Sequence, residues 1–201
     1  MTRQVMWIVA MGVAGCGKST LAAAIAARTG LPFIEGDDFH SPQSVAKMLA
    51  GKPLSDADRA DWLNRLGIEL AWQADGAVVS CSALKHMYRE RLRAAVPGLK
   101  FVFLEIERET AEQRVAARAG HMFPAGLLEC QFATLESPRA EPGVLTVVAT
   151  EPVDALCAQV LAWAGAANLA YERPAAAESA IADTVPAGSA HRRAPGATDD
   201  H

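Results

Sequence analysis

Apolar and polar residues alternate in blocks along the first 165 residues, and these blocks predict strands followed by helices. Five short apolar runs have the length of buried strands, and they span 4–11, 32–36, 76–83, 100–106 and 143–150. Segments with helical composition or periodicity lie between and after them, at 19–29, 55–76, 107–120 and 152–165. This alternation is typical of a parallel sheet that helices cover on both faces, so we predict an α/β fold.

The segment 55–76 shows how the pattern predicts a helix. Ser55, followed three residues later by Asp58, is a capping signal for a helix N-terminus. Trp62, Leu66 and Leu70 then recur every four residues, which places them on one apolar face. We therefore expect a helix that packs this face against the sheet.

The composition changes after Gly165, where alanine, proline and glycine become frequent and large apolar side chains become rare. Such a segment cannot bury enough apolar surface to offset the entropy lost on ordering. We predict one folded domain over residues 1–165 and a disordered Ala/Pro-rich tail over residues 166–201.

Composition and charge exclude several classes of protein. The chain has 201 residues, 51% hydrophobic and 21% charged, which is ordinary for a globular domain. Its formal net charge of −4 implies no general attraction to nucleic acid or to an anionic membrane. No apolar run reaches the roughly 18 residues of a membrane helix. The apolar N-terminal run continues into a glycine-rich motif that signal cleavage would destroy, so we predict a first strand.

The four cysteines are widely spaced and form no C-x-x-C pair, so the sequence suggests neither a zinc site nor a disulfide framework. We expect small buried or loop residues in a reducing cytoplasm. Cys16 lies at a predicted helix N-terminus, where a lowered thiol pKa is a secondary alternative.

A phosphate-binding motif connects the first strand to the first helix. The stretch "GVAGCGKST" fits G-x-x-x-x-G-K-[ST], and its predicted ATP-binding residues are Gly12, Val13, Ala14, Gly15, Cys16, Gly17, Lys18, Ser19 and Thr20. The backbone N–H groups of such a loop and the following helix N-terminus surround phosphate oxygens. Lys18 would reach the β- and γ-phosphates, and Ser19 would hold Mg²⁺. The alternative is a glycine-rich turn that only caps a helix.

Polar residues follow the second and third predicted strands. Asp37, Asp38 and His40 follow the second, and Ser82 and Lys85 follow the third. Because the carboxyl ends of parallel strands meet at one edge, these groups should lie near the phosphate loop. That favours a catalytic acid over a solvated turn. A metal cluster is less favoured, since one histidine and two adjacent acids supply few convergent ligands.

An acid near the γ-phosphate suggests a hydroxyl acceptor, and nearby cations suggest that the acceptor is an anion. The candidate cations are Lys47, Arg59, Lys85 and Arg89. Arg59 falls in the first turn of its predicted helix, where the dipole disfavours a cation, so a ligand role is one explanation. Pairing with Asp56 or Asp58 is the alternative.

Arg114 and Arg118 are four residues apart on one predicted helix face, and "GHMFP" follows. This pattern resembles a lid, at about 118–126, that brings arginine to a transferring phosphoryl group. The alternative is a solvated basic helix end.

Several segments occur together in an order that is similar to the gluconokinase family of P-loop kinases. They are "MGVAGCGKST", "EGDDFHS", "KMLAGKPLSDADRADWL", "SCSALKHMYRERLR" and "RAGHMFPAGLLECQFATLESP". The resemblance covers roughly residues 5–165. Met122 and Cys130 stand where the family suggests Phe and Ser, and the tail is not part of the family pattern.

The resemblance implies ATP-dependent phosphorylation of D-gluconate to 6-phospho-D-gluconate in a cytoplasmic protein that is often a homodimer. It implies a nucleoside-monophosphate-kinase-like P-loop NTPase fold with a five-stranded parallel sheet and a lid. In this hypothesis Asp37 handles the 6-hydroxyl, and Arg118 of the lid approaches the phosphates. The other substrate-binding residues are His40, Arg59, Lys85, Arg89, His121 and Gln131.

Two other functions remain open from the sequence. One is a P-loop kinase for another acceptor, such as shikimate or a nucleoside monophosphate. The other is a nucleotide-binding module without catalysis, which would be expected to lack Lys18 or the acid after the second strand, yet both are present.

Overall fold

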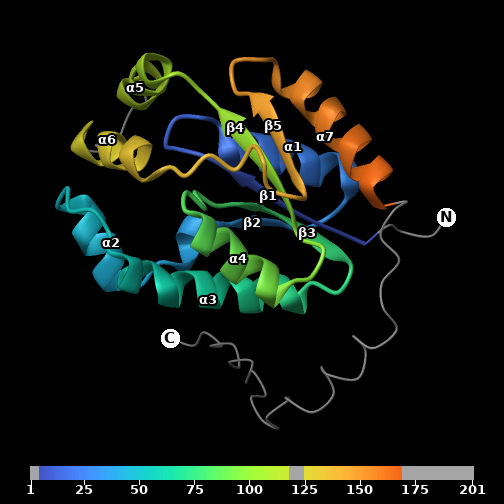
Figure 1. Ribbon diagram of the computed structural model, residues 1–201, viewed down its shortest axis with the longest axis horizontal. Coiled ribbons are helices and arrows are strands. Elements are labelled where there is room, and N and C mark those ends of the chain that lie inside the picture. Colours follow the sequence, from blue (N-terminus) through green and yellow to red (C-terminus); the bar gives the residue numbers. More distant parts are fainter. Residues whose placement is uncertain (1–4, 118–124, 169–201) are drawn as a thin grey trace, which may run out of the picture. The chain divides into compact units, whose positions relative to one another are not determined.

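The computed structural model describes residues 5–117 and 125–168 (Figure 1). Its strands are β1 (Met6–Met11), β2 (Phe33–Glu35), β3 (Gly76–Ser80), β4 (Lys100–Glu105) and β5 (Val144–Val148). Its helices are α1 (Lys18–Thr29), α2 (Pro42–Leu49), α3 (Asp56–Trp72), α4 (His86–Ala95), α5 (Arg108–Ala116), α6 (Ala125–Thr134) and α7 (Val153–Asn168). A 3₁₀ turn, η1 (Gly36–Phe39), follows β2.

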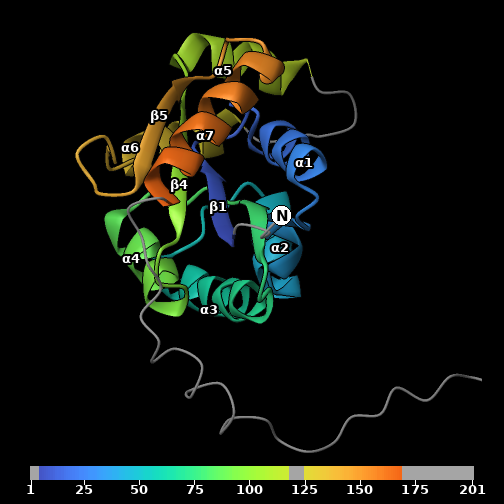
Figure 2. The same ribbon diagram turned by 90° about the vertical axis from the view of Figure 1, so that its right-hand side faces the viewer.

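The five strands form one parallel sheet in the order β2-β3-β1-β4-β5. Helices α1 and α7 lie against one face, and α3 and α4 against the other (Figures 1 and 2). Successive residues of β1 therefore enter different cores, Ile8 facing α1 and Val9 facing α3. The predicted parallel α/β fold is confirmed.

Helix α3 forms as its sequence predicts. The Ser55 hydroxyl accepts a hydrogen bond from the Asp58 N–H, and the Asp58 carboxylate accepts one from the Ser55 N–H, which completes a capping box. Trp62, Leu66 and Leu70 are all at most 1% exposed and pack against the sheet. The apolar stripe therefore sets the orientation of the helix that carries Arg59.

Helices α2, α4 and α6 were not predicted from the sequence. Helix α4 reads "HMYRERLRAA", in which charged residues obscure a narrow buried face of Tyr88, Arg89 and Leu92. Helix α2 begins with Ser41 accepting from the Ser44 N–H and Pro42 in the first turn, both ordinary start signals.

Parts of the predicted domain plan fall outside the described residues. These are residues 118–124 of the predicted lid and most of the predicted tail, from 169 onward. Helix α7 continues to Asn168, three residues past the predicted end of the domain. No helix in the described part of the chain is both long and apolar enough to span a bilayer.

Candidate active site

The loop between β1 and α1 has the backbone that a phosphate site requires. Gly12, Gly15 and Gly17 have φ angles of 141°, 80° and 97°, which residues with a Cβ rarely adopt. A Cβ on Gly15 would also lie 2.8 Å from the carbonyl oxygen of Ala111 on α5. Glycine at these positions lets the loop curve tightly and lets α5 pack against it.

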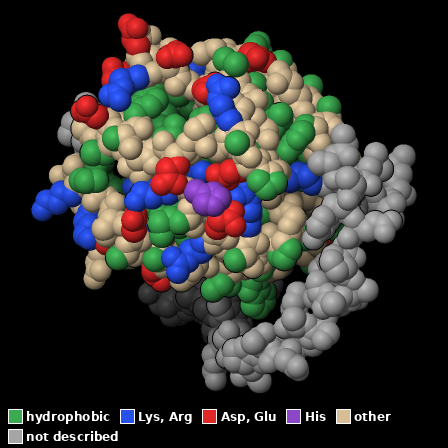
Figure 3. All heavy atoms as spheres, viewed as in Figure 1, with side chains coloured by type: hydrophobic (Ala, Val, Ile, Leu, Met, Phe, Trp, Pro, Cys, Tyr) green, Lys and Arg blue, Asp and Glu red, His purple; other side chains and the backbone are tan. Residues whose placement is uncertain are grey.

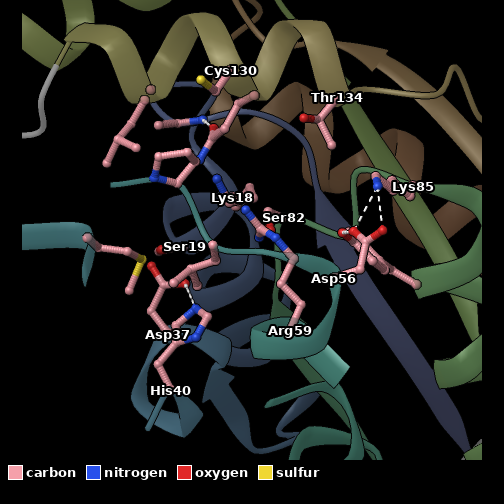
Figure 4. Close-up of a pocket in the computed structure, with 18 of the residues that line it drawn as sticks. Lys18, Ser19, Asp37, His40, Asp56, Arg59, Ser82, Lys85, Cys130 and Thr134 are labelled. Atoms are coloured by element: carbon pink, nitrogen blue, oxygen red, sulfur yellow. Dashed lines mark hydrogen bonds and ion pairs between the residues drawn. The ribbon is translucent and has the colours of Figure 1, made fainter. Parts of the chain in front are cut away.

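Lys18 and Ser19 begin α1, and both line a cavity next to this loop (Figure 4). The Lys18 ammonium donates to the Val13 carbonyl over 2.9 Å, so it stays folded back on the loop. A helix N-terminus, a lysine and curved backbone together form a site for a polyanion. Cys16 is buried, and burial raises the pKa of its thiol against the opposing effect of Lys18, so the lowered pKa considered from the sequence is wrong.

The cavity measures about 240 Å³ and lies at the carboxyl edge of the sheet (Figure 4). It is lined by the phosphate loop, η1, the end of α2, the start of α3, the β3–α4 loop and one face of α6. Residues far apart in the sequence therefore meet around one space, where the sheet topology predicts a ligand.

Two contacts of the neighbouring Gly36 hold Asp37 in this cavity. A Cβ on Gly36 would lie 2.2 Å from the Ser80 carbonyl oxygen, so only glycine allows η1 to approach β3 this closely. The indole N–H of buried Trp62 donates to the Gly36 carbonyl over 2.7 Å. Together these contacts fix the backbone next to the Asp37 carboxylate.

The Asp37 carboxylate is suited to accept a proton. Its side chain is 75% exposed, yet it lies in a concave site surrounded by protein atoms. This desolvation raises the pKa of Asp37, and the nearby charge of Lys18 partly opposes the rise. Asp38 does not line the cavity.

His40 lies behind Asp37. Its ring stacks on Trp62 with 4.3 Å between centroids, and its Nε2 is 3.8 Å from a carboxylate oxygen of Asp37. Burial, followed by the charges of Arg59 and Arg65, lowers the pKa of His40 to about 4, so the ring is neutral at pH 7. The buried Nδ1 has no hydrogen-bond partner among the described residues.

Four groups from α3 and the β3–α4 region form the opposite wall. Lys85 donates to both oxygens of Asp56, at 2.7 and 2.8 Å, and the Tyr88 hydroxyl donates to the same carboxylate. Arg59 points into the cavity with its guanidinium 5.8 Å from the centre of the Tyr88 ring (Figure 4). Within the described chain Arg59 makes no side-chain hydrogen bond or ion pair, so its pairing with Asp56 or Asp58 is not observed.

Helix α6 covers the phosphate loop. Its cavity-lining residues, Leu127, Cys130, Gln131 and Thr134, recur at helical spacing along one face. The Gln131 Oε1 accepts a hydrogen bond from the backbone N–H of Ala14 over 2.6 Å. Gln131 thus contacts the phosphate loop directly.

Comparisons with known proteins agree with this geometry. The model of a family described as "AAA domain" matches residues 7–141. A gluconokinase of Gluconobacter oxydans is 41% identical over 158 residues, which are 77% of this chain and 89% of that protein. The chain belongs to the gluconokinase family.

Solved structures agree with the fold described above. A gluconokinase structure from Sinorhizobium meliloti superposes with a TM-score of 0.77 at 42% identity, covering 85% of this chain and 99% of that one. A shikimate kinase from Aquifex aeolicus is 15% identical, with a TM-score of 0.58 over 83% of this chain and all of that one, so it shares the fold alone. The P-loop kinase fold implied by the gluconokinase resemblance is confirmed.

Arg89 corrects the substrate set expected for a gluconokinase. It is fully buried, does not line the cavity, and donates to the carbonyls of Ala83 and Leu84 and to the Glu141 carboxylate. Its donors are therefore used inside the protein. Sequence spacing could not show this, because Glu141 lies 52 residues further along the chain.

The other predicted cations have different positions. Lys47 pairs with Asp58 at 2.6 Å and does not line the cavity. Arg114 donates to the Ala149 carbonyl over 3.1 Å. Arg118 and His121, from the predicted gluconokinase lid, lie outside the described residues.

Asp56 and Tyr88 line the cavity but received no substrate role from the sequence. Asp56 appeared only as an ion-pair alternative, and Tyr88 only as part of a quoted segment. Tyr88 lies three residues after Lys85 at the start of α4, so this spacing could have placed both on one side of the helix.

Proposed function

We propose that the protein transfers the γ-phosphoryl group of ATP to the 6-hydroxyl of D-gluconate, giving 6-phospho-D-gluconate and ADP. One observation carries this proposal. A phosphate loop, the acid Asp37 and the guanidinium of Arg59, which forms no ion pair with another described residue, line a single cavity. These three elements match a triphosphate, a hydroxyl and a carboxylate in turn.

The residues present fit ATP and Mg²⁺. The curved glycine backbone and the N-terminus of α1 suit the phosphates, Lys18 can extend to their outer oxygens, and the Ser19 hydroxyl is available for the metal. Bound Mg²⁺ would neutralise charge on the β- and γ-phosphates. Homodimerisation and a cytoplasmic location stay predictions from the family resemblance.

In the proposed reaction the 6-hydroxyl oxygen forms a bond to the γ-phosphorus while the bond between that phosphorus and the leaving ADP oxygen breaks. Asp37 orients the hydroxyl and takes its proton, which its raised pKa favours. Neutral His40 behind Asp37 leaves the carboxylate without a fixed cationic partner on that side.

Arg59 is the residue that we expect to bind the gluconate carboxylate. Its planar guanidinium can donate two parallel hydrogen bonds to a carboxylate. Lys85 is already held by Asp56, so it contributes a positive wall and places Asp56 where substrate hydroxyls can donate to it.

Assays with a panel of possible phosphoryl acceptors test the proposed function. ADP release would be measured with gluconate, shikimate, nucleoside monophosphates and the uncharged polyol sorbitol, with Lys18→Ala as the control for contaminating kinases. We expect activity with gluconate only, and Arg59→Met should raise the KM for gluconate by about 10- to 100-fold, since a charge-assisted bond is worth about 1.5–3 kcal/mol. Activity with another acceptor alone would reject gluconate, and activity with none would favour a binding module.

A further inference from the structure

One backbone N–H of the phosphate loop is already hydrogen-bonded to a side chain from outside the loop. The Ala14 N–H donates to the side-chain oxygen of Gln131, which is 117 residues away in the sequence. Both residues line the cavity beside Lys18. Loop N–H groups of this kind are the donors that bind phosphate oxygens. Gln131 therefore holds a donor that a nucleotide would otherwise use.

The chemistry of the contact makes it a competition. A carboxamide oxygen and a phosphate oxygen are both hydrogen-bond acceptors, and a single N–H has one strong hydrogen bond to give. At 2.6 Å the Gln131 oxygen occupies the place where a phosphate oxygen would lie. A phosphate can take this donor only after the Gln131 side chain turns away.

The position of Ala14 indicates which phosphate is affected. Ala14 lies four residues before Lys18 and faces α6, whereas Lys18 and Ser19 begin α1. The inner phosphates lie near the helix N-terminus, so the Ala14 donor is placed for the outermost one.

We propose that Gln131 is a specificity-determining residue that competes with the γ-phosphate for the Ala14 N–H, and so lowers the affinity for ATP relative to ADP. The proposal rests on the proposed use of ATP. Gln131 moves aside when the triphosphate enters, and it returns to Ala14 once the phosphoryl group has been transferred.

The test compares two nucleotides on matched variants. Calorimetry would measure binding of ADP and of a non-hydrolysable ATP analogue, both with Mg²⁺. Gln131→Met keeps the length of the side chain and removes the acceptor. Gln131→Glu keeps an acceptor and adds a negative charge. Gln113→Met, on the exposed surface of α5, is the control for a loss of glutamine elsewhere.

We expect Gln131→Met to bind the triphosphate analogue about three- to tenfold more tightly, as the loss of one competing hydrogen bond predicts, with ADP changed less than twofold. Gln131→Glu should weaken the analogue at least tenfold more than ADP. Equal shifts for both nucleotides, or weaker binding of the analogue to Gln131→Met, would overturn the proposal. A wild type that binds the analogue but does not phosphorylate gluconate would reject the proposed substrate alone.

Discussion

At the scale of single residues, the placement of Asp37 depends on neighbours that have no charge. Gly36 allows the close approach to β3, and Trp62 holds the Gly36 carbonyl and stacks on His40. The sequence identified "GDD" as the candidate acid but could not choose between its two aspartates from geometry. The structure places Asp37 in the cavity, and Asp38 is exposed outside it.

Asp37→Asn should lower turnover by about 10²- to 10⁴-fold, the usual contribution of a general base, and should change ATP binding little. Asp38→Asn is the matched control and should keep wild-type turnover. Steady-state kinetics and nucleotide titration would measure both effects. Near wild-type turnover in Asp37→Asn would show that Asp37 is not the base.

The pH profile provides a second readout of the same variant. Desolvation raises the pKa of Asp37, so its carboxylate should become protonated at a higher pH than an ordinary aspartate does. As the pH is lowered, kcat/KM of the wild type should therefore begin to decrease above the ordinary aspartate range. Asp37→Asn should lack this acid limb.

At the scale of elements, the loop between β3 and α4 depends on one buried arginine. Ala83 in this loop has a left-handed φ of 42°, and its carbonyl accepts from Arg89 over 2.8 Å. The same guanidinium binds Glu141, which also pairs with Arg93. Figure 3 shows this region from outside, with acidic and basic side chains interspersed around a histidine over α4. Arg89 thus positions the loop that carries Ser82 and Lys85.

Arg89→Met should lower the free energy of unfolding by about 3–5 kcal/mol, because it leaves buried acceptors without their partner. Arg91→Met, two residues along on the exposed side of α4, should change it by about 0.5 kcal/mol or less. Urea unfolding would measure both. If Arg89 instead bound substrate, Arg89→Met would leave stability unchanged and raise the KM for gluconate.

The elements also show what a sequence can predict. Strand patterns, the α3 capping box and the phosphate loop are local signals, and each appears where it was predicted. Arg59 and Arg89 were both candidate cations in the sequence, and only the place of Arg59 in the first turn of its predicted helix set it apart. What separates them is a partner at Glu141, and contacts between such distant residues leave no local pattern.

At the scale of the whole molecule, Glu141 links the segment before β5 to α4 and to the loop after β3. Burial alone would raise the pKa of Glu141, but hydrogen bonds from Arg89, His86 and Arg93 outweigh burial and lower the pKa to about 2. A pKa that is depressed in the folded state stabilises the protein above the unfolded-state pKa.

Glu141 should therefore account for a loss of about 3 kcal/mol of wild-type stability as pH falls from 4.5, the ordinary pKa, to about 2. Glu141→Gln, which cannot titrate, should lose this share of the pH dependence while starting from a lower stability. Unfolding free energies across this range would show it. Parallel pH curves for the two proteins would contradict the assignment.

The strand order sets the spacing between the two chain segments that carry the phosphate loop and the acid. The phosphate loop follows β1 and the acid follows β2, and β3 lies between these two strands. Neighbouring strands are about 4.8 Å apart, so the carboxyl ends of β1 and β2 are separated by two such steps, about 10 Å. Hydrogen bonds between the strands fix that spacing, so substitutions in the cavity wall leave it unchanged. A phosphoryl acceptor of a different size would therefore have to be accommodated by substitutions of side chains in the cavity wall. Met48, Leu54 and Arg59 are three such side chains.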